Sequence, residues 1–298
     1  MSAPALDVPA SAGNPGAKAL TGALNRFVTV PADVAQYDTD VETASRALRA
    51  EPAAVEALAG AGLPHVADPE RGPLFDYDDV MNVGMFSGTG ETVPELGLRF
   101  LMRFAAAAPA SWYEPREWLV GIDPAGSLGP LAEGASGPRI EVRTPDTTAA
   151  GLEVLSRPCG DATLPPPLDA DLQTGGYELA VRLTGERQTV TDPRAYAIWD
   201  GIVTPLAERT VTYQTVPERL RADHHRAWDL GIADCIVASK LLAERLTAAG
   251  LTARVRRGYL LGLFGSDHAW CELEEDGVRK PLDPVFCFVA RTGDKARG

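Results

Sequence analysis

The stretch TARVRRGYLLGLFGSDHAWCELEEDGVRKPLDPVF, residues 252–286, predicts three consecutive strands joined by two tight turns. Gly265-Ser266 forms the first turn, and Asp276-Gly277 is the dipeptide typical of a two-residue hairpin. The strands are expected over 253–263, 268–274 and 280–283. Both turns make neighbouring strands antiparallel, so this stretch predicts a small antiparallel sheet.

The second predicted hairpin brings His268 close to Asp283. If Glu275 pairs with Val278 across the turn, His268 lies opposite a residue near 285, and Asp283 is its diagonal neighbour. We therefore expect a hydrogen bond between the two side chains. His268 and Cys271 face opposite sides of their strand, so a zinc site built from them is not expected.

The segment GIADCIVASKLLAERL, residues 231–246, predicts a buried helix that carries Cys235 in its first turn. Apolar side chains recur at helical spacing after Cys235, and the helix is expected to end at Gly250. Asp234 can cap it. The unbonded N–H groups of a first helical turn favour a thiolate, so the pKa of Cys235 is expected to be lowered.

Together these predictions place a nucleophile, a base and an orienting carboxylate within one site. Packing of the helix start on the sheet would bring Cys235 to the imidazole nitrogen of His268 that Asp283 does not bind. The alternative is that Cys235 is a small apolar residue of the core, the commoner fate of a single cysteine.

The order of these residues resembles the transglutaminase-like superfamily. The chain has a Cys at a helix start, followed by Gly-x-x-Ala-Arg leading into a strand. A glycine comes four residues later, and the motifs HAW-x-E and PLDP follow it. These features fall on Cys235, on Gly250, Ala253 and Arg254, on Gly258, and on 268–272 and 281–284. The match covers about 205–290. The superfamily usually has glycine before the cysteine, where this chain has Asp234.

The resemblance implies an α+β fold with a transglutaminase-like or papain-like core, in which the Cys-bearing helix packs on an antiparallel sheet. It implies a catalytic triad of Cys235, His268 and Asp283 that needs no cofactor and no metal. The backbone N–H of Cys235 is expected in the oxyanion hole. A side-chain donor from Gln214, Trp228 or Trp199 is a further hypothesis.

The expected reaction is acyl transfer through a thioester on Cys235, which forms an amide between an acyl donor and an amine. The donor is a small molecule or a carrier-protein thioester, by analogy with standalone transglutaminase homologues of bacterial natural-product biosynthesis. Two alternatives stay open: a cysteine peptidase or amidase, and a transglutaminase-like binding module without turnover.

Composition limits the remaining classes. The chain of 298 residues carries a net charge of −13, which argues against nucleic-acid or anionic-membrane binding. No stretch reads as a membrane span or a secretory signal, and four cysteines are no disulfide framework, so a cytoplasmic location is expected. A bias towards Ala, Pro, Arg and Gly over Lys is typical of high-GC bacterial coding.

We expect a disordered tail over 1–20, an accessory region of mixed helices and strands over 21–160, and the catalytic core over 161–298. The Ala-rich segment 43–63 shows helical periodicity, and a second helix is expected after a capping box formed by Thr92 and Glu95. The residues Asp76, Asp78, Asp79 and Asn82 do not fit a calcium loop, but their density suggests substrate contact as an alternative to a structural role.

Overall fold

The computed structural model describes residues 16–105, 107–122, 151–156, 177–259 and 267–295. The chain divides into two compact units, one formed by 1–106 with 189–298 and the other by 107–188. Both the 160/161 boundary and the Gly265-Ser266 turn expected from the sequence lie outside the described residues. Of the predicted tail, residues 17–20 belong to helix α1, and Leu20 in it is fully buried.

The smaller unit contains one antiparallel sheet of strand order β4-β6-β5. Arg182 on the central strand forms ion pairs of 2.6 Å with Glu117 and with Glu153 on the two outer strands. The elements are a 3-10 helix, Pro109–Trp112, and the strands β4 (Arg116–Ile122), β5 (Leu152–Ser156) and β6 (Tyr177–Leu183).

The N-terminal part of the larger unit consists of short helices around a sheet of order β1-β3-β2. Its core is a cluster of buried apolar side chains that includes Leu20, Leu48 and Phe75. The elements are α1 (Ala17–Thr21), β1 (Tyr37–Thr39), α2 (Val41–Leu48), α3 (Pro52–Gly60), β2 (His65–Asp68), β3 (Gly72–Asp76), α4 (Tyr77–Phe86) and α5 (Val93–Ala105).

The segment 43–63 is not one helix, as its periodicity suggests, but lies in the two helices α2 and α3. Arg49 adopts a left-handed conformation with φ 51° and ends α2. Pro52 then begins α3, and the residue before a proline is disfavoured in helical conformation. The helix α5 begins as predicted, because Glu95 donates its N–H to the Thr92 hydroxyl, and the Glu95 carboxylate accepts the Thr92 N–H in return.

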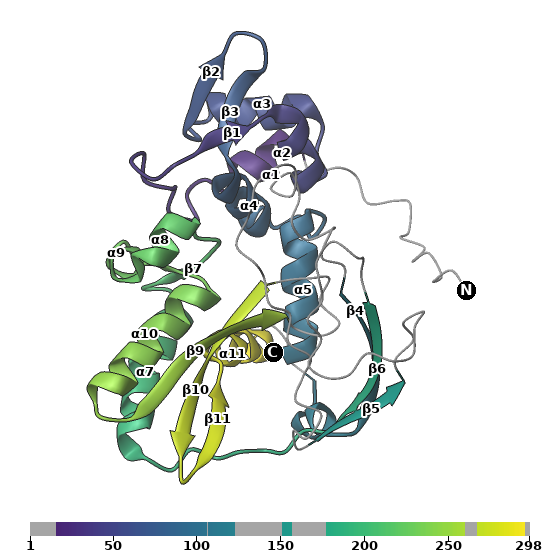
Figure 1. The fold of residues 1–298 in the computed structure, drawn as a ribbon. Helices are drawn as coiled ribbons and strands as arrows, with labels where there is room; N and C mark the ends of the chain where they lie inside the picture. Colours follow the sequence, from purple (N-terminus) through teal and green to yellow (C-terminus); the bar gives the residue numbers. More distant parts are fainter. Residues whose placement is uncertain (1–15, 106, 123–150, 157–176, 260–266, 296–298) are drawn as a thin grey trace, which may run out of the picture. The chain divides into compact units, whose positions relative to one another are not determined.

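The C-terminal part of the larger unit holds the predicted sheet, with strand order β11-β10-β9 (Figure 1). Asp276 and Gly277 have φ of 56° and 75°, as the two-residue turn requires. The elements are α7 (Pro193–Ala207), β7 (Thr212–Tyr213), α8 (Glu218–Ala222), α9 (His224–Asp229), β8 (Ile232–Ala233), α10 (Cys235–Ala248), β9 (Thr252–Tyr259), β10 (Asp267–Glu275), β11 (Val278–Leu282) and α11 (Pro284–Lys295).

Helix α10 is the centre of this part and is apolar on nearly all sides. It packs on β9 and β10, and α7, α9 and α11 contact it as well (Figure 1). A helix covered on several sides must be apolar around its circumference, which explains why nine of its residues are buried. The face of β10 that carries Ala269, Cys271 and Leu273 is fully buried, in the alternation that the sequence predicts.

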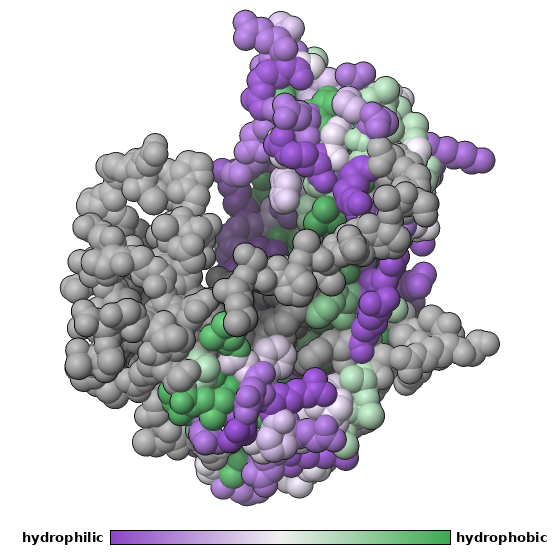
Figure 2. Space-filling view, turned by 90° about the vertical axis from the view of Figure 1, so that its right-hand side faces the viewer, coloured by the Kyte–Doolittle hydropathy of each residue, from purple (hydrophilic) through white to green (hydrophobic). Residues whose placement is uncertain are grey.

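Figure 2 shows one face of the molecule. On this face, hydrophilic side chains are interspersed with smaller hydrophobic areas (Figure 2). Within the described ranges, no helix has the length and apolar character that crossing a membrane requires.

Candidate active site

The imidazole of His268 and the carboxylate of Asp283 are in direct contact. The β10–β11 ladder runs from the pair Glu275–Val278 to the pair Cys271–Leu282, so Asp283 is the first residue beyond the paired region. His268 Nε2 lies 2.5 Å from Asp283 Oδ2. The pairing and the contact expected from the hairpin are both confirmed.

Asp283 also begins the next helix, which fixes its position. Its second oxygen, Oδ1, accepts a 2.9 Å hydrogen bond from the backbone N–H of Phe286 in the first turn of α11. Pro284 follows as the first helical residue, where its missing N–H is no loss. One carboxylate oxygen therefore orients the imidazole while the other caps a helix.

Cys235 is the first residue of α10 and packs in one apolar cluster with Ala269 of β10. Its Sγ accepts a hydrogen bond from the backbone N–H of Ala269, the residue that follows His268 on β10. The side chain belongs to an apolar cluster with Ala269 and Val285, and Cys235 is only 8% exposed. Because Nε2 of His268 faces Asp283, Nδ1 is the ring nitrogen left to accept a proton.

Burial, not the helix start, dominates the acidity of this thiol. It raises the pKa of Cys235 to about 12, and the neighbouring Asp234 charge acts in the same direction. The Ala269 N–H and the Arg221 guanidinium oppose the rise but do not outweigh it. The expected lowered pKa is thus wrong: without a base, Cys235 stays a neutral thiol near neutral pH.

Asp234, which precedes the cysteine directly, caps α10 as predicted. Its Oδ1 accepts hydrogen bonds of 2.9 Å from the N–H groups of Ile236 and Val237, which leaves the N–H of Cys235 itself uncapped. Oδ2 lies 2.5 Å from Nε of Arg221 in α8. Burial lowers the pKa of Arg221, but the Asp234 carboxylate outweighs it and leaves that pKa above its usual value.

The glycine and the tryptophan of the motifs fit together physically. Gly258 pairs with His268 across β9 and β10, and a Cβ there would lie 3.1 and 3.3 Å from ring atoms of Trp270. The Trp270 ring in turn stacks on His268 at a centroid distance of 6.4 Å and an angle of 23°. The absent side chain at Gly258 therefore gives room to a ring that supports the imidazole.

The side-chain oxyanion donors proposed from sequence have other contacts. Gln214 accepts from the N–H of Val28 at 3.0 Å and donates to its carbonyl at 2.8 Å, so both ends of the amide are engaged. The Trp228 ring lies 5.6 Å from the guanidinium carbon of Arg245. Arg245 is ten residues after Cys235, so the two positions are about 15 Å apart along α10. Trp199 and Trp228 pack on a third buried cluster, which includes Ile202, Val237 and Leu241, and not on that of Cys235. Their catalytic roles stay predictions.

Tyr213 is a residue of this site that the sequence did not single out. The parallel pairing of β7 with β8 places it opposite Ala233, two residues before Cys235. Its ring packs on Phe288 of α11 at 5.8 Å and belongs to the cluster of Cys235. Burial raises the pKa of the Tyr213 phenol well above its usual value, and the charges of Cys235 and Asp283 add to this. No local pattern marks a strand of two residues, so the sequence gives little signal for Tyr213.

The acidic segment has structural contacts instead of an open site. Asp76 caps α4 through the N–H of Asp78, and Asp79 Oδ1 accepts from the N–H of Val30 at 2.9 Å. The Asn82 amide donates to the Thr215 carbonyl at 3.1 Å and accepts its N–H at 2.8 Å. The two Asn82 bonds join α4 to the segment that follows β7.

Among the described residues, one group has the composition of a metal site. Nε2 of His224 and Nε2 of His225 lie 2.9 and 2.8 Å from the same Glu244 oxygen, so α9 and α10 are joined on their polar faces. This group could hold a metal ion, but it shares no contact with the His268–Asp283 pair.

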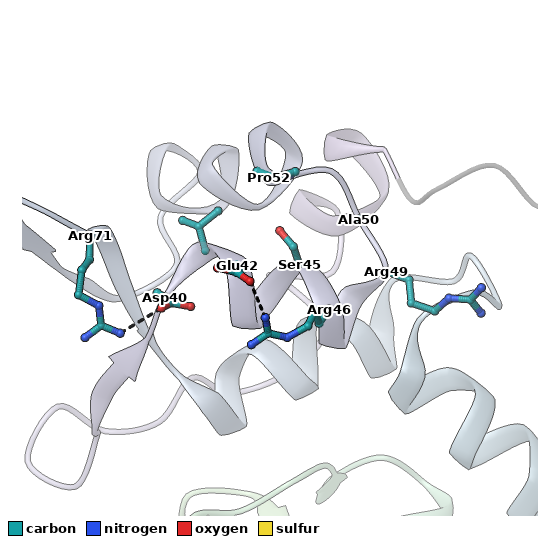
Figure 3. Close-up of a pocket in the computed structure, with 9 residues that line it drawn as sticks. Asp40, Glu42, Ser45, Arg46, Arg49, Ala50, Pro52 and Arg71 are labelled. Carbon is teal, nitrogen blue, oxygen red and sulfur yellow. Dashed lines mark hydrogen bonds and ion pairs between the residues drawn. The ribbon is translucent and has the colours of Figure 1, made fainter.

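A cavity of about 640 Å³ beside α2 is lined by three arginines, but they do not converge (Figure 3). Arg46 is paired with Glu42 at 2.8 Å and Arg71 with Asp40 at 3.1 Å, while Arg49 points away from both. With its cations dispersed and two of them neutralised, this depression has no organised binding site.

Comparisons with known proteins add little to this geometry. No protein-family model matches the chain, and no curated protein matches it. A solved structure described as that of a TGase shares 15% sequence identity over 65% of this chain and 58% of its own, with a TM-score of 0.22. The chain thus spans little more than half the length of that protein, and a likeness at this TM-score supports no argument about fold or function.

Proposed function

We propose that the protein is a transglutaminase-like enzyme in which Cys235, His268 and Asp283 catalyse acyl transfer to an amine. The observation that carries the proposal is the contact of 2.5 Å between His268 and Asp283, where the residue after His268, Ala269, packs in the same cluster as Cys235 at the start of a buried helix. This is the order of nucleophile, base and orienting carboxylate that nucleophilic catalysis needs.

In the first step His268 Nδ1 takes the thiol proton while Sγ attacks the acyl carbonyl. The S–C bond forms, the bond to the leaving group breaks, and the leaving group takes the proton from His268. Asp283 holds the ring in the correct tautomer and stabilises the imidazolium. Because the resting thiol is neutral, proton removal accompanies the attack.

In the second step an amine attacks the thioester. The N–C bond forms, the C–S bond breaks, and the amine proton returns through His268 to the thiol. The uncapped N–H of Cys235 and the phenol of Tyr213 are the groups beside the thiol that can stabilise the oxyanion. The apolar surroundings of Cys235 favour an amine over water at this step, and so favour transfer over hydrolysis.

Trapping of the acyl-enzyme tests the proposal. The protein is incubated with a panel of acyl thioesters, weighed intact, and then exposed to amines or to buffer alone. We expect a mass increase that Cys235→Ala abolishes and Cys287→Ala does not, and release by amines. His268→Gln should slow acylation by about 10²–10⁴-fold.

Each other outcome selects a different function. Release mainly by water would indicate a cysteine peptidase or amidase. No Cys235-dependent adduct with any donor, in a protein that is folded, would indicate a binding module.

A further inference from the structure

A second cavity, of about 380 Å³, is lined in part by the apolar cluster that contains Cys235. Its volume lies within the range of small-molecule sites. Five of its lining residues belong to the same packed cluster as Cys235: Leu98, Met102, Tyr213, Phe288 and Val289. Tyr213 thus lines the cavity and also packs on the cluster that contains Cys235.

Two arginines supply the charge of this otherwise largely apolar cavity. Arg26 lines it and donates from Nη1 to the Phe86 carbonyl at 2.6 Å, and Arg209 lines it after the end of α7. Neither guanidinium forms an ion pair with a carboxylate of the described residues. In a chain with a net charge of −13, two such cations on one apolar cavity favour an anionic ligand.

The backbone at Arg209 gives an independent reason to assign a role to its side chain. The N–H of Arg209 bonds the Leu206 carbonyl and the N–H of Thr210 bonds the Pro205 carbonyl, which together form a Schellman motif at the end of α7. Arg209 has φ 60° at the position of this motif where glycine is usual. A bulky side chain in this left-handed conformation costs stability, so the fold alone would favour glycine.

We propose that this cavity binds an apolar chain that carries one anionic group, with the chain against Met102 and Phe288 and the anion at Arg209 and Arg26. The claim that this cavity holds the acyl donor rests on the proposed function. The claim that it binds such a ligand does not. The anion is a carboxylate at the far end of the acyl chain, or a phosphate or sulfonate on the thiol side of the thioester, and both present the same chemistry to the guanidinium groups.

Binding is tested on the Cys235→Ala protein, where no reaction interferes. Octanoate, octanol and octylammonium share one chain and differ in charge, and calorimetry compares their affinities. We expect octanoate to bind about tenfold more tightly than octanol. Arg209→Gly should remove this difference without lowering the melting temperature, because glycine suits the left-handed position. Arg209→Lys should retain part of the preference, and the exposed Arg219→Gly should leave it unchanged.

Equal affinity for the three ligands, or a preference that survives Arg209→Gly, would overturn the proposal. Acylation of the native protein then identifies the source of the anion, with octanoyl and suberyl thioesters of a neutral thiol and an octanoyl thioester of a sulfonated thiol. If octanoate binds through Arg209 but no thioester acylates Cys235, the proposed function fails and the binding site stands. If thioesters react without regard to charge, the site fails and the function stands.

Discussion

The two parts of the larger unit both bury aspartates, but they hold them in different ways. In the C-terminal part, over 189–295, three buried or half-buried carboxylates each have a basic side chain as partner. Asp234 has Arg221 at 2.5 Å, Asp283 has His268 at 2.5 Å, and Glu275 has Lys280. These pairs connect elements that meet around Cys235 or at the end of the β10–β11 hairpin.

In the N-terminal part, over 17–86, the buried aspartates bind backbone N–H groups. Asp76 accepts from Gln36 at 2.7 Å and from Asp78 at 2.9 Å. Asp79 is fully buried, accepts from Val30 alone, and its Oδ2 has no hydrogen-bond partner among the described residues. Burial raises the pKa of Asp79 to about 7, with the neighbouring Asp76 and Asp78 charges adding to it.

This difference determines the sign of a substitution. Removal of the cation beside Asp234 leaves a buried charge without a partner, which destabilises a protein strongly. Neutralisation of Asp79 instead removes a charge that the fold does not compensate. The C-terminal part therefore depends on its charged pairs, whereas the N-terminal part would be more stable without the Asp79 charge.

The largest effect is expected from Arg221→Met. The Asp234 carboxylate keeps its two backbone N–H bonds but loses its cation, so the free energy of unfolding should fall by about 3–5 kcal/mol in urea titrations. The double variant Arg221→Met/Asp234→Asn should recover most of this loss, since neither charge remains. The exposed Arg219→Met, in the same helix, should change stability by less than about 0.5 kcal/mol. A single variant as stable as the native protein would contradict the role assigned to this pair.

Asp79→Asn should act in the opposite direction, and more strongly as the pH rises. An unfolded aspartate titrates near 3.9, and Asp79 in the folded protein near 7, so the folded state binds the proton more tightly. This contribution to stability is complete below about pH 4 and is lost as the pH rises through 7. Asparagine stays neutral and can still accept the Val30 N–H. The variant should match the native protein only below about pH 4, and its advantage in the free energy of unfolding should grow from about 1.5 kcal/mol at pH 5 to about 4 kcal/mol at pH 8.

The exposed Asp200→Asn serves as the control and should alter neither curve. If Asp79→Asn destabilises the protein equally at both pH values, the carboxylate is needed in its charged form. The contrast between the two parts would then not hold.

Local sequence was sufficient for much of the site. The Asp276-Gly277 turn fixes the register of β10 on β11, and the register alone brings His268 to Asp283. The N-cap at Asp234 and the left-handed Gly250 after α10 follow equally from residue type. These features span at most a few tens of residues and follow from turn and capping chemistry.

The remainder depends on contacts that no local pattern encodes. Gln214 and Val28 are 186 positions apart, and Tyr213 reaches the site through a strand of two residues. The acidity of Cys235 was mispredicted for the same reason, because burial results from the packing of distant elements around α10. The break between α2 and α3 is different, since Pro52 already signals it in the sequence.

A smaller effect, within the C-terminal part, is expected in the pH dependence of Cys235 alkylation. Because the pKa of Cys235 is about 12, the fraction of thiolate rises about tenfold for each pH unit below that value. Each tenfold step corresponds to about 1.4 kcal/mol in the free energy of deprotonation. The rate of modification by iodoacetamide, followed by intact mass with Cys235→Ala as the blank, should increase without a plateau between about pH 7 and 10. A plateau below pH 8 would show a preformed thiolate, and burial would then not govern the acidity of Cys235.

The smallest effect is expected from Gly258→Ala, which tests whether support of the imidazole is distinct from stability. The new Cβ would lie 3.1 Å from the nearest Trp270 atom, so this half-buried ring must move by a few tenths of an ångström. The better strand propensity of alanine offsets this strain, and stability should change by less than about 1 kcal/mol. The displaced ring no longer stacks squarely on His268, so acylation should slow by about threefold to tenfold.

Gly201→Ala in α7 is the matched control, because its Cβ has only an ordinary contact of 3.6 Å with Arg245 and no link to the site. Unchanged acylation in a stable Gly258→Ala protein would mean that the Asp283 carboxylate alone orients His268, and that charged partners suffice in this part of the molecule.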